Sequence, residues 1–458
     1  MEIVDKNASF VEFRKKYPVF TYESFDYKLT ERGISFSFHF HIGDEWHFNP
    51  ASEIDFQQVP LLKNIPEAEI ENLVFHIGMI ELISYWKPTC SPSVVIKPYK
   101  LSEDQIKWWK KLWYNGLGEF FYINSIHTSA KDFLWISSGE KELSSFDYSA
   151  GNPLSTLVPI GGGKDSPVTL ELIKNSGRQV IPLIINPRGA TLNTVKMSGL
   201  PMDAFVSVKR SIDPVLLEMN SKGYLNGHTP FSAMLAFYTL LMARMTGVSD
   251  IALSNESSAN ESTVPGTDVN HQYSKSFEFE QDFRDYYKKY ISEGFNYFSF
   301  LRPLTELQIA GLFSQMTVYH EVFRSCNAGS KEDIWCGKCP KCLFANIILS
   351  PFLPPEKLKE IFGSDLFDNK ALETAFDELT GKIPVKPFEC VGTVSEVNEA
   401  IQLAIQKFYQ EKDTLPYLLS VYEKRHPETV VNSPGFWNKE HNLSPFYEKI
   451  LQHVSGAE

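Results

Sequence analysis

The amino-acid sequence predicts an α/β protein built on a parallel sheet. Between Leu154 and Ser254, short apolar runs alternate with amphipathic segments that begin and end at residues typical of helix termini. Such alternation indicates parallel strands joined by crossover helices. The chain has 458 residues, more than one hydrophobic core usually contains, so several domains are expected. We predict an α+β domain at 1–150, the parallel-sheet domain at 151–350 and a helical region at 351–458.

The composition and charge exclude some classes of function. Apolar residues make up 43% and charged residues 22%, which is ordinary for a globular protein. The formal net charge of −12 argues against nucleic acid as a partner, because that affinity comes from clustered Lys and Arg. The first residues, MEIVDKNASF, lack the pattern of a secretion signal, so we expect a cytoplasmic location. The longest apolar stretch, Phe231–Ala243, is shorter than the ~20 residues of a membrane span, and none is expected.

The first 150 residues contain few clear elements. An alternating run at Gly33–His41 predicts a strand. The segment Leu101–Leu117 predicts an amphipathic helix with Ser102 as its cap. We expect this region to contribute to substrate recognition.

The central region shows a regular succession of elements. A strand at Leu154–Ile160, a helix at Pro167–Asn175 and a strand at Gln179–Asn186 form one β-α-β unit. A later helix is expected to begin with Thr229 as its cap and to end at Gly247. The remaining predicted elements are a helix at 213–223, a strand at 250–254, and C-terminal helices at 395–409 and 415–424. Prolines at 351–355 could form a hinge into the helical region.

A glycine-rich loop, Gly161-Gly162-Gly163-Lys164-Asp165-Ser166, follows the first strand of that unit. Free backbone N–H groups and the helix dipole favour an anion there, and glycines let the backbone approach a phosphate closely. Lys164 adds positive charge, Ser166 offers a hydroxyl, and Asp165 could hold a magnesium ion. The spacing fits neither a Walker A loop nor the dinucleotide fingerprint. The loop predicts a phosphate site, and the alternative is a turn without a ligand.

Two polar residues, Asn255 and Glu256, follow the strand predicted at 250–254. Ligands of open α/β sheets bind at this edge, so we expect Glu256 to assist magnesium or substrate. The alternative is a solvated loop carboxylate.

Four of the six cysteines form the pattern Cys-x9-Cys-x2-Cys-x2-Cys: Cys326, Cys336, Cys339 and Cys342. Four thiolates at this spacing can surround a tetrahedral zinc ion, and such a complete shell is usually structural. An iron–sulfur cluster uses the same ligands and remains an alternative, as do four metal-free buried thiols. Cys90 and Cys390 stand apart from this group.

The glycine loop closely resembles the SGGxDS loop of PP-loop ATP pyrophosphatases, with Gly161 in place of the first serine. The cysteine pattern resembles the zinc site of PP-loop nitrile synthases. The stretch from Glu218 to Asp368 resembles the UDP-N-acetylmuramoyl-L-alanyl-L-glutamate epimerase (MurL) family. The matching segments are NSKGYLNGHTP, SNESSANESTVPGTDVNHQYSKSFEFEQ, FSFLRPLTEL, SCN, WCGKCPKC and PFLPPEKLKEIFGSDLFDN.

The resemblance implies a HUP-like PP-loop ATP domain that binds ATP and Mg²⁺. It implies an isomerase that converts the L-glutamyl residue of UDP-N-acetylmuramoyl-L-alanyl-L-glutamate to its D isomer during peptidoglycan precursor synthesis. ATP would convert the α-carboxylate to an acyl-adenylate, which makes the neighbouring C–H acidic enough for a general base. AMP and pyrophosphate would be released.

The proton-transfer groups are inferred from residue type within the matching segments. His228 and His271 titrate near neutral pH and are our first candidates, with Glu256, Glu261 and Lys275 as others. For each histidine, a purely structural role is the alternative.

Two other functions remain open. One is another PP-loop enzyme that amidates or thiolates a tRNA base or a metabolite, although the net charge disfavours tRNA. The other is a zinc-stabilised binding protein with an inactive nucleotide site, which the presence of Lys164, Asp165 and Ser166 disfavours.

Overall fold

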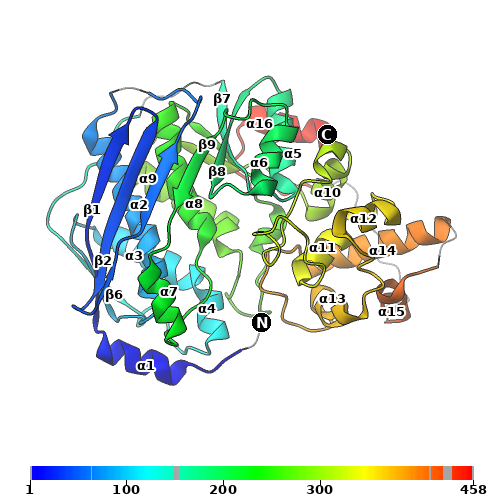
Figure 1. The fold of residues 1–458 in the computed structure, drawn as a ribbon, viewed down its shortest axis with the longest axis horizontal. Coiled ribbons are helices and arrows are strands. Elements are labelled where there is room, and N and C mark those ends of the chain that lie inside the picture. Colours follow the sequence, from blue (N-terminus) through cyan, green and yellow to red (C-terminus); the bar gives the residue numbers. More distant parts are fainter. Residues whose placement is uncertain are drawn as a thin grey trace.

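The fold is α/β, with a mostly parallel sheet and a helical C-terminal region, as predicted (Figure 1). The computed structural model describes residues 3–62, 64–148, 152, 154–411, 414–425 and 436–455. The strands are β1 (Val19–Thr30), β2 (Gly33–Ile42), β3 (Trp46–Phe48), β4 (Ala51–Asp55), β5 (Ser93–Ile96), β6 (Trp135–Ser138), β7 (Ser155–Pro159), β8 (Gln179–Ile185), β9 (Val206–Arg210), β10 (Asp250–Leu253) and β11 (Asn296–Ser299).

The helices alternate with the strands up to residue 314 and dominate thereafter. The helices are α1 (Asn7–Lys16), α2 (Glu67–Trp86), α3 (Glu103–Gly116), α4 (Gly118–Ile123), α5 (Asp165–Asn175), α6 (Gly189–Met197), α7 (Pro214–Ser221), α8 (Phe231–Thr246), α9 (Phe277–Tyr290), α10 (Glu306–Ser314), α11 (Pro340–Leu349), α12 (Pro355–Phe362), α13 (Glu373–Leu379), α14 (Val394–Gln410), α15 (Tyr417–Arg425) and α16 (Pro445–Ser455).

One sheet passes through the first two predicted regions. Its order is β11-β10-β7-β8-β9-β4-β2-β1-β5-β6, with β3 paired to β2. The strands from β11 to β9 are all parallel. Beyond them, β4 pairs antiparallel with β9, so the N-terminal strands extend the sheet directly. The boundary predicted at 150/151 falls among residues outside the described ranges.

The order of the parallel strands creates a switch point between β7 and β10. From β7 the chain moves to β8 and β9 on one side and then returns to β10 on the other. The two loops that follow β7 and β10 therefore diverge at the carboxyl edge of the sheet. Open α/β sheets bind their ligands at such a place.

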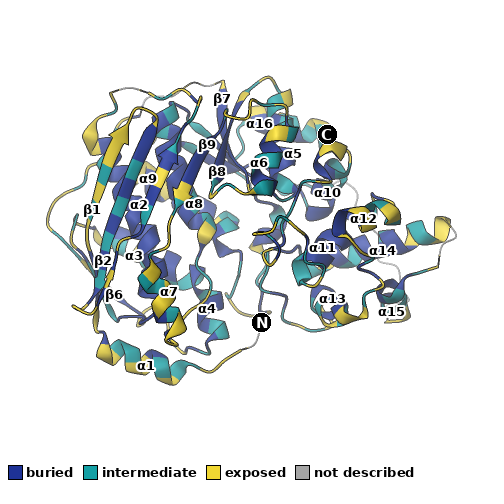
Figure 2. Cartoon of the chain, viewed as in Figure 1, coloured by how far each residue is buried: buried dark blue, intermediate teal, exposed yellow. Residues whose placement is uncertain are grey.

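Helices cover both faces of the parallel half. Adjacent residues of β7 enter different cores, because side chains alternate along a strand. Leu157 belongs to the core that contains α2, α3, α8 and α9, whereas Val158 belongs to the core shared with α5, α10 and α11. Figure 2 shows the buried sides of these helices turned toward the sheet and toward one another.

The helical region from α11 to α15 lies beside the sheet, and the last helix returns to it (Figure 1). Helix α16 packs against α5. The Tyr447 hydroxyl lies 2.6 Å from that of Thr156 on β7 and donates to the Asp250 carboxylate on β10 at 2.8 Å. Helix α16 therefore stabilises β7, which leads into the glycine loop, and the neighbouring strand β10.

Several predicted elements occur close to their expected bounds. The run Gly33–His41 forms β2, and Leu101–Leu117 contains α3, in which the Ser102 hydroxyl accepts from the Gln105 N–H at 3.2 Å. Helix α5 begins at Asp165 rather than at Pro167, because Lys164 already has helical dihedral angles. The expected Thr229 cap is wrong: α8 is preceded by Pro230, and its N-terminus has no side-chain cap.

Candidate active site

The glycine loop connects the end of β7 to the start of α5 at the switch point. Gly162 has a φ of +82°, and a Cβ there would lie 3.0 Å from Ala190 of α6. Only glycine fits this left-handed backbone and close approach. The N-terminus of α5 has no side-chain cap in the described chain, so its first N–H groups are available to an anion.

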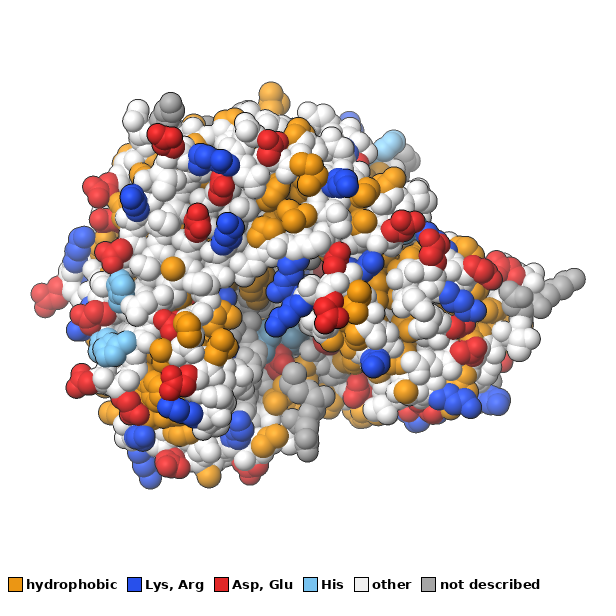
Figure 3. All heavy atoms as spheres, viewed as in Figure 1, with side chains coloured by type: hydrophobic (Ala, Val, Ile, Leu, Met, Phe, Trp, Pro, Cys, Tyr) orange, Lys and Arg blue, Asp and Glu red, His pale blue; other side chains and the backbone are white. Residues whose placement is uncertain are grey.

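A cavity of about 450 Å³ opens at this edge of the sheet. Four residues of the predicted loop line it: Gly161, Gly163, Asp165 and Ser166. The loop after β10 contributes Ser254 and Asn255, while Arg188, Lys275 and Arg324 supply positive charge. Figure 3 shows a hollow beside the helical region, with Lys or Arg side chains at its rim and a histidine side chain within it.

Two hydroxyls in the cavity wall are available for a ligand. Ser166 Oγ and Ser254 Oγ are buried and have no hydrogen-bond partner within the part of the chain that the structure describes. A buried hydroxyl without a partner is costly, so each such group calls for an explanation. A bound phosphate at the glycine loop would provide oxygen atoms that accept from both.

Lys164 does not line the cavity but lies among carboxylates. Its ammonium group pairs with Asp165 and with the buried Glu306 at the start of α10. Burial acts to raise the pKa of Glu306, and the Lys164 ammonium group opposes this rise. Lys164 therefore neutralises buried acids and orients Asp165 toward the cavity.

The C-terminal region takes part in this acidic cluster. Glu396, near the start of α14, accepts from the Glu306 backbone N–H at 2.8 Å. Glu396 also accepts from Thr393 within a capping box, and burial raises its pKa. The first turn of α14 is thereby fixed beside the glycine loop.

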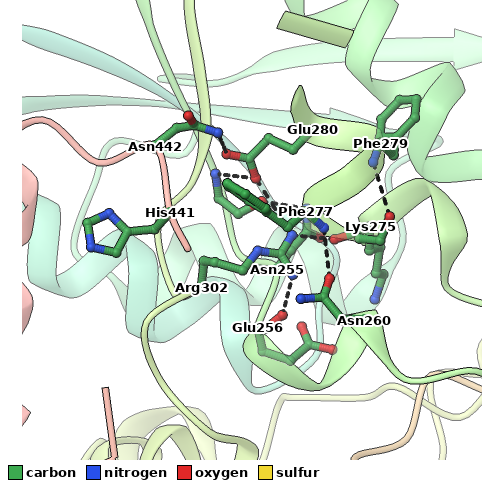
Figure 4. Close-up of polar contacts among 12 residues, drawn as sticks. Asn255, Glu256, Asn260, Lys275, Phe277, Phe279, Glu280, Arg302, His441 and Asn442 are labelled. Carbon is green, nitrogen blue, oxygen red and sulfur yellow. Dashed lines mark hydrogen bonds and ion pairs between the residues drawn. The ribbon is translucent and has the colours of Figure 1, made fainter. Parts of the chain in front are cut away.

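Glu256 is buried with 2% of its surface exposed, so the solvated-loop alternative is wrong for this residue. The backbone around it is held by the fully buried Arg302, which the sequence analysis did not single out (Figure 4). The Arg302 guanidinium donates to the Glu256 carbonyl at 2.6 Å and also to the Lys275 carbonyl. It forms an ion pair with Glu280 at 3.6 Å. Arg302 therefore joins the loop after β10 to the segment that carries Lys275.

The four predicted cysteines lie together. The sulfur atoms of Cys326, Cys336, Cys339 and Cys342 are all within 4.8 Å of one another. Individual Sγ–Sγ distances of 3.5–3.7 Å fit four thiolates that converge on one small space. The donor set fits a tetrahedral zinc ion or an iron–sulfur cluster.

The cysteine cluster adjoins the glycine loop. Cys326 lines the cavity, and two residues earlier the Arg324 backbone N–H donates to the Gly162 carbonyl at 2.7 Å. A metal at the cysteines would therefore fix the wall of the cavity opposite α5.

The predicted histidines also come together, although 43 positions separate them in the sequence. The ring centroids of His228 and His271 are 4.6 Å apart. Glu119 of α4 lies between them, with its Oε2 at 2.5 Å from His271 Nδ1 and 3.5 Å from His228 Nδ1. The structure brings the pair into one cluster, with a buried carboxylate that the sequence analysis missed.

The two histidines have opposite charge preferences. Burial lowers the pKa of His228 to about 3, and the nearby His271 and Lys87 act in the same direction. Burial also acts to lower the pKa of His271, but Cys390 and Glu119 raise it to about 9. At neutral pH His228 is neutral and His271 is protonated. The cluster thus places a neutral imidazole beside a protonated one, the two states that a general base and a general acid need.

Lys87 is a second residue that the sequence analysis missed. From the end of α2, its ammonium group donates to the Thr229 hydroxyl at 2.6 Å, to the His228 carbonyl at 3.2 Å and to the Gly227 carbonyl. These bonds explain why Thr229 is not a helix cap and fix the backbone at His228. No local sequence signal links Lys87 to this site.

A larger groove of about 840 Å³ lies elsewhere, on β1, β2, β4 and β9. None of the predicted site residues lines it. It is open, and its lining alternates between charged and small polar side chains such as Asp26, Lys28 and Ser35. The chemistry-bearing residues lie instead around the glycine loop.

The fold and the site define an α/β protein with a glycine-rich loop at a sheet switch point, a four-cysteine cluster and a histidine pair beside a buried glutamate. Two family models match: the MurL N-terminal domain over residues 12–300 and the MurL C-terminal domain over residues 322–431. The chain belongs to the MurL family.

Curated relatives agree with this assignment. A UDP-N-acetyl-alpha-D-muramoyl-L-alanyl-L-glutamate epimerase from Xanthomonas oryzae pv. oryzae is 33% identical over 347 residues, covering 74% of this chain and 76% of the relative. Proteins with the same description from Salinispora tropica and a Micromonospora strain are 34% and 33% identical, covering 76% and 83% of those relatives. No solved structure matches the chain. Within the described residues, no helix has the length and apolar character to cross a membrane.

Proposed function

We propose that this protein is an ATP-dependent epimerase that converts UDP-N-acetylmuramoyl-L-alanyl-L-glutamate to its D-glutamyl isomer. The family assignment supports the substrate, because the relatives are described as epimerases of this compound. The observation that carries the ATP-dependent mechanism is the glycine loop at the switch point, whose cavity contains two hydroxyls that have no hydrogen-bond partner among the described residues.

The cavity fits the triphosphate of ATP in the manner of a PP-loop enzyme. The N-terminus of α5 and the glycine backbone would hold phosphate oxygens, with Ser166 donating from its hydroxyl. Asp165, held by Lys164, would bind Mg²⁺ together with phosphate oxygens, and Glu256 lies near enough to the acidic cluster to assist. Arg188 and Arg324 would balance the charge of the leaving pyrophosphate.

Activation of the α-carboxylate explains why an epimerase needs ATP. An ionised carboxylate makes its neighbouring C–H a very weak acid, whereas the neutral acyl-adenylate withdraws electrons from the α-carbon. A base can then remove the α-proton, an acid can return one to the opposite face, and hydrolysis releases product and AMP. We assign proton transfer to the histidine cluster, in which His271 is protonated and His228 is neutral at pH 7.

The cysteine cluster has a structural role in this proposal. All four thiolates are needed for a complete shell around zinc, which leaves no position for substrate. Sulfur atoms 3.5–3.7 Å apart can all reach one ion at the Zn–S distance of about 2.3 Å, so we assign zinc, and not an iron–sulfur cluster, to hold the wall of the ATP cavity.

The proposal is tested by running the reaction in D2O with the L-glutamyl substrate, ATP and Mg²⁺. The product should be the D isomer with deuterium at the α-carbon, and AMP and pyrophosphate should form alongside it. The precursor that ends in L-alanine serves as a control for recognition of the glutamyl residue, and it should give neither inversion nor AMP. Product that keeps its original hydrogen, or release of ADP, would contradict the mechanism.

A further inference from the structure

Cys390 lies beside the histidine cluster, although it comes from the loop before α14. The loop is held by the side chain of Gln272, which donates to the Val391 carbonyl at 3.1 Å. It is also held at Thr263, whose carbonyl accepts from the Lys386 N–H at 3.1 Å. The Thr263 hydroxyl in turn accepts from the His271 N–H at 3.0 Å, so one residue anchors both the thiol loop and the histidine.

The Cys390 thiol has two charged partners. It lies close enough to His271 and Lys275 to interact with both of their charges. Lys275 also lines the ATP cavity and lies close enough to Asp165 and Glu256 for their charges to raise its pKa. The cluster of Glu119, His271, Cys390 and Lys275 thus connects the buried histidines to the phosphate loop. In an acyl-adenylate the α-carbon is only two bonds from the carboxyl oxygen that carries phosphorus, so a phosphate held at the glycine loop would bring the α-carbon toward Lys275, which lines the cavity.

The charges around Cys390 favour its thiolate. Burial acts to raise the pKa of Cys390, but the positive charges of Lys275 and His271 lower it to about 6. The chain offers a contrast in Cys90, which is fully buried and donates to the Lys87 carbonyl at 3.2 Å. Burial raises the pKa of Cys90 above the ordinary thiol value. Only one of these two isolated cysteines is thus set up to accept a proton at neutral pH.

We propose that Cys390 removes the α-proton of the activated glutamyl residue and that His271 returns a proton to the opposite face; this rests on the proposed function. The resting pair consists of a thiolate and an imidazolium, which are the base and the acid that one inversion consumes. In many active sites, the general acid and the general base are a pair of titratable groups whose surroundings shift their pKa values in opposite directions. In this proposal the α-carbon lies between the thiolate and the imidazolium, at the roughly 3–3.5 Å of a reacting contact.

The proton and electron balance is complete without any further reagent. The Cα–H bond breaks, the proton forms an S–H bond on Cys390, and the electron pair moves to the carbonyl oxygen as an enolate beside the Lys275 ammonium group. The His271 N–H bond then breaks, its proton adds to the α-carbon from the other face, and the carbonyl re-forms. Cys390 has gained one proton and His271 has lost one, and exchange with water restores both. His228 and Glu119 position His271.

The charge state of Cys390 can be tested without turnover. Iodoacetamide alkylation of the full chain, followed by peptide mass spectrometry, gives the labelling rate of each cysteine against pH. We expect the Cys390 rate to rise with a midpoint near 6. In His271→Gln the midpoint should rise, while Cys90 should stay unlabelled in both proteins because it is buried. A Cys390 midpoint at the ordinary thiol value of about 8.5 would overturn the proposal.

The catalytic role is tested with Cys390→Ala and, as a matched control, Cys90→Ala. Cys390→Ala should lose inversion and α-deuterium incorporation by roughly 10²- to 10⁴-fold, while pyrophosphate exchange into ATP stays within tenfold. Retained exchange also shows that the variant is folded. Cys90→Ala should keep both activities.

The outcomes separate the two proposals. If the unaltered chain inverts the substrate and Cys390→Ala inverts it within twofold of that rate, Cys390 is not the base and the epimerase assignment stands. If the unaltered chain forms neither AMP nor D-glutamyl product, the proposed function fails and the role of Cys390 in it fails as well.

Discussion

At the scale of single residues, the site depends on charges that are buried in pairs. Lys164 and Glu306 illustrate this, because both are buried and each compensates the charge of the other, while the partly exposed Asp165 is the second partner of Lys164. Lys164, which was predicted to add positive charge to the glycine loop, pairs with Asp165 and Glu306, and we infer that it orients Asp165. Removing one member of such a cluster has a different effect according to how deeply that member is buried.

Asp165→Ala should abolish AMP formation and leave the melting temperature of the protein nearly unchanged. The Asp165 side chain is 30% exposed, and Lys164 keeps its ion pair with Glu306 in the variant. The loss of a magnesium ligand should therefore reduce turnover by at least ~10²-fold without unfolding the chain. Glu306→Ala is the contrasting variant, because it removes the buried partner and should lower the melting temperature. Full AMP formation by Asp165→Ala would contradict the assignment.

The site residues that could be predicted from the sequence are those that belong to a recognisable short segment. The glycine loop, the four cysteines and the two histidines each lie in a short segment with a characteristic spacing or residue type. Glu119, Lys87 and Cys390 carry no such signal, because they reach the site from α4, α2 and the loop before α14. Only the tertiary fold brings them within hydrogen-bonding distance, and a single sequence does not report such contacts.

At the scale of elements, the loop that bears Cys326 and the helix α11 are joined to the glycine loop. Cys339 directly precedes α11, and Cys342 lies in its first turn. The Arg324–Gly162 backbone bond transmits the position of this segment to the cavity. This bond therefore couples the proposed metal to the position of the glycine loop in the cavity wall.

Cys339→Ser should reduce the metal content and destabilise the folded chain. The binding energy of a four-thiolate site contributes to folding, so we expect the melting temperature to fall by roughly 5–10 °C. Lys338→Ala is the matched control, since Lys338 is exposed and lies next to Cys339. Elemental analysis of freshly purified protein should find about one zinc per chain, as a single four-thiolate shell implies. Protein with neither zinc nor iron would refute the site.

Helix α2 contains a second test at this scale, in its buried residue His76. Its Nδ1 donates to the Asn72 carbonyl at 2.8 Å, and its Nε2 accepts from the Tyr286 hydroxyl at 3.0 Å. Burial lowers the pKa of His76 to about 4. The unfolded chain binds this proton from about pH 6.5 downward, so the free energy of unfolding should fall between pH 6.5 and 4.

His76→Gln should reduce that pH dependence by about 3 kcal/mol over this interval. Urea unfolding of the two proteins at several pH values between 7 and 4 measures the difference. His453→Gln, at an exposed position of α16, is the control and should leave the pH dependence unchanged. Parallel stability curves for the unaltered chain and His76→Gln would show that His76 does not remain neutral in the fold.

At the scale of the whole molecule, one sheet unites regions that the sequence suggested were separate. The β-α-β succession predicted the parallel strands and their helices, because the hydrophobic periodicity and the residues that end a helix are both local features of the sequence. The pairing of β4 with β9 was not predictable in this way, since 150 residues separate the two strands and neither carries a partner-specific pattern. The MurL N-terminal family domain, at 12–300, spans this junction.

The continuity of the sheet predicts that residues 151–458 do not fold without residues 1–150. Helix α8 packs against α2, and the Tyr238 hydroxyl lies 2.6 Å from that of Ser52. Arg210 on β9 forms a buried ion pair with Glu81 at 2.6 Å, which the fragment would leave broken. The fragment would also expose β9 as an unpaired edge and the apolar face of α8 to water, both of which favour aggregation.

We therefore expect the fragment 151–458 to show no cooperative unfolding transition by circular dichroism, whereas the full chain prepared in the same way should show one. Co-expression of 1–150 with 151–458 should restore a soluble complex, because the β4–β9 pairing and the α2–α8 contact need proximity and not a covalent link. A sharp, reversible transition of the isolated fragment would mean that the parallel half is an independent domain and that its stability does not depend on the pairing of β4 with β9.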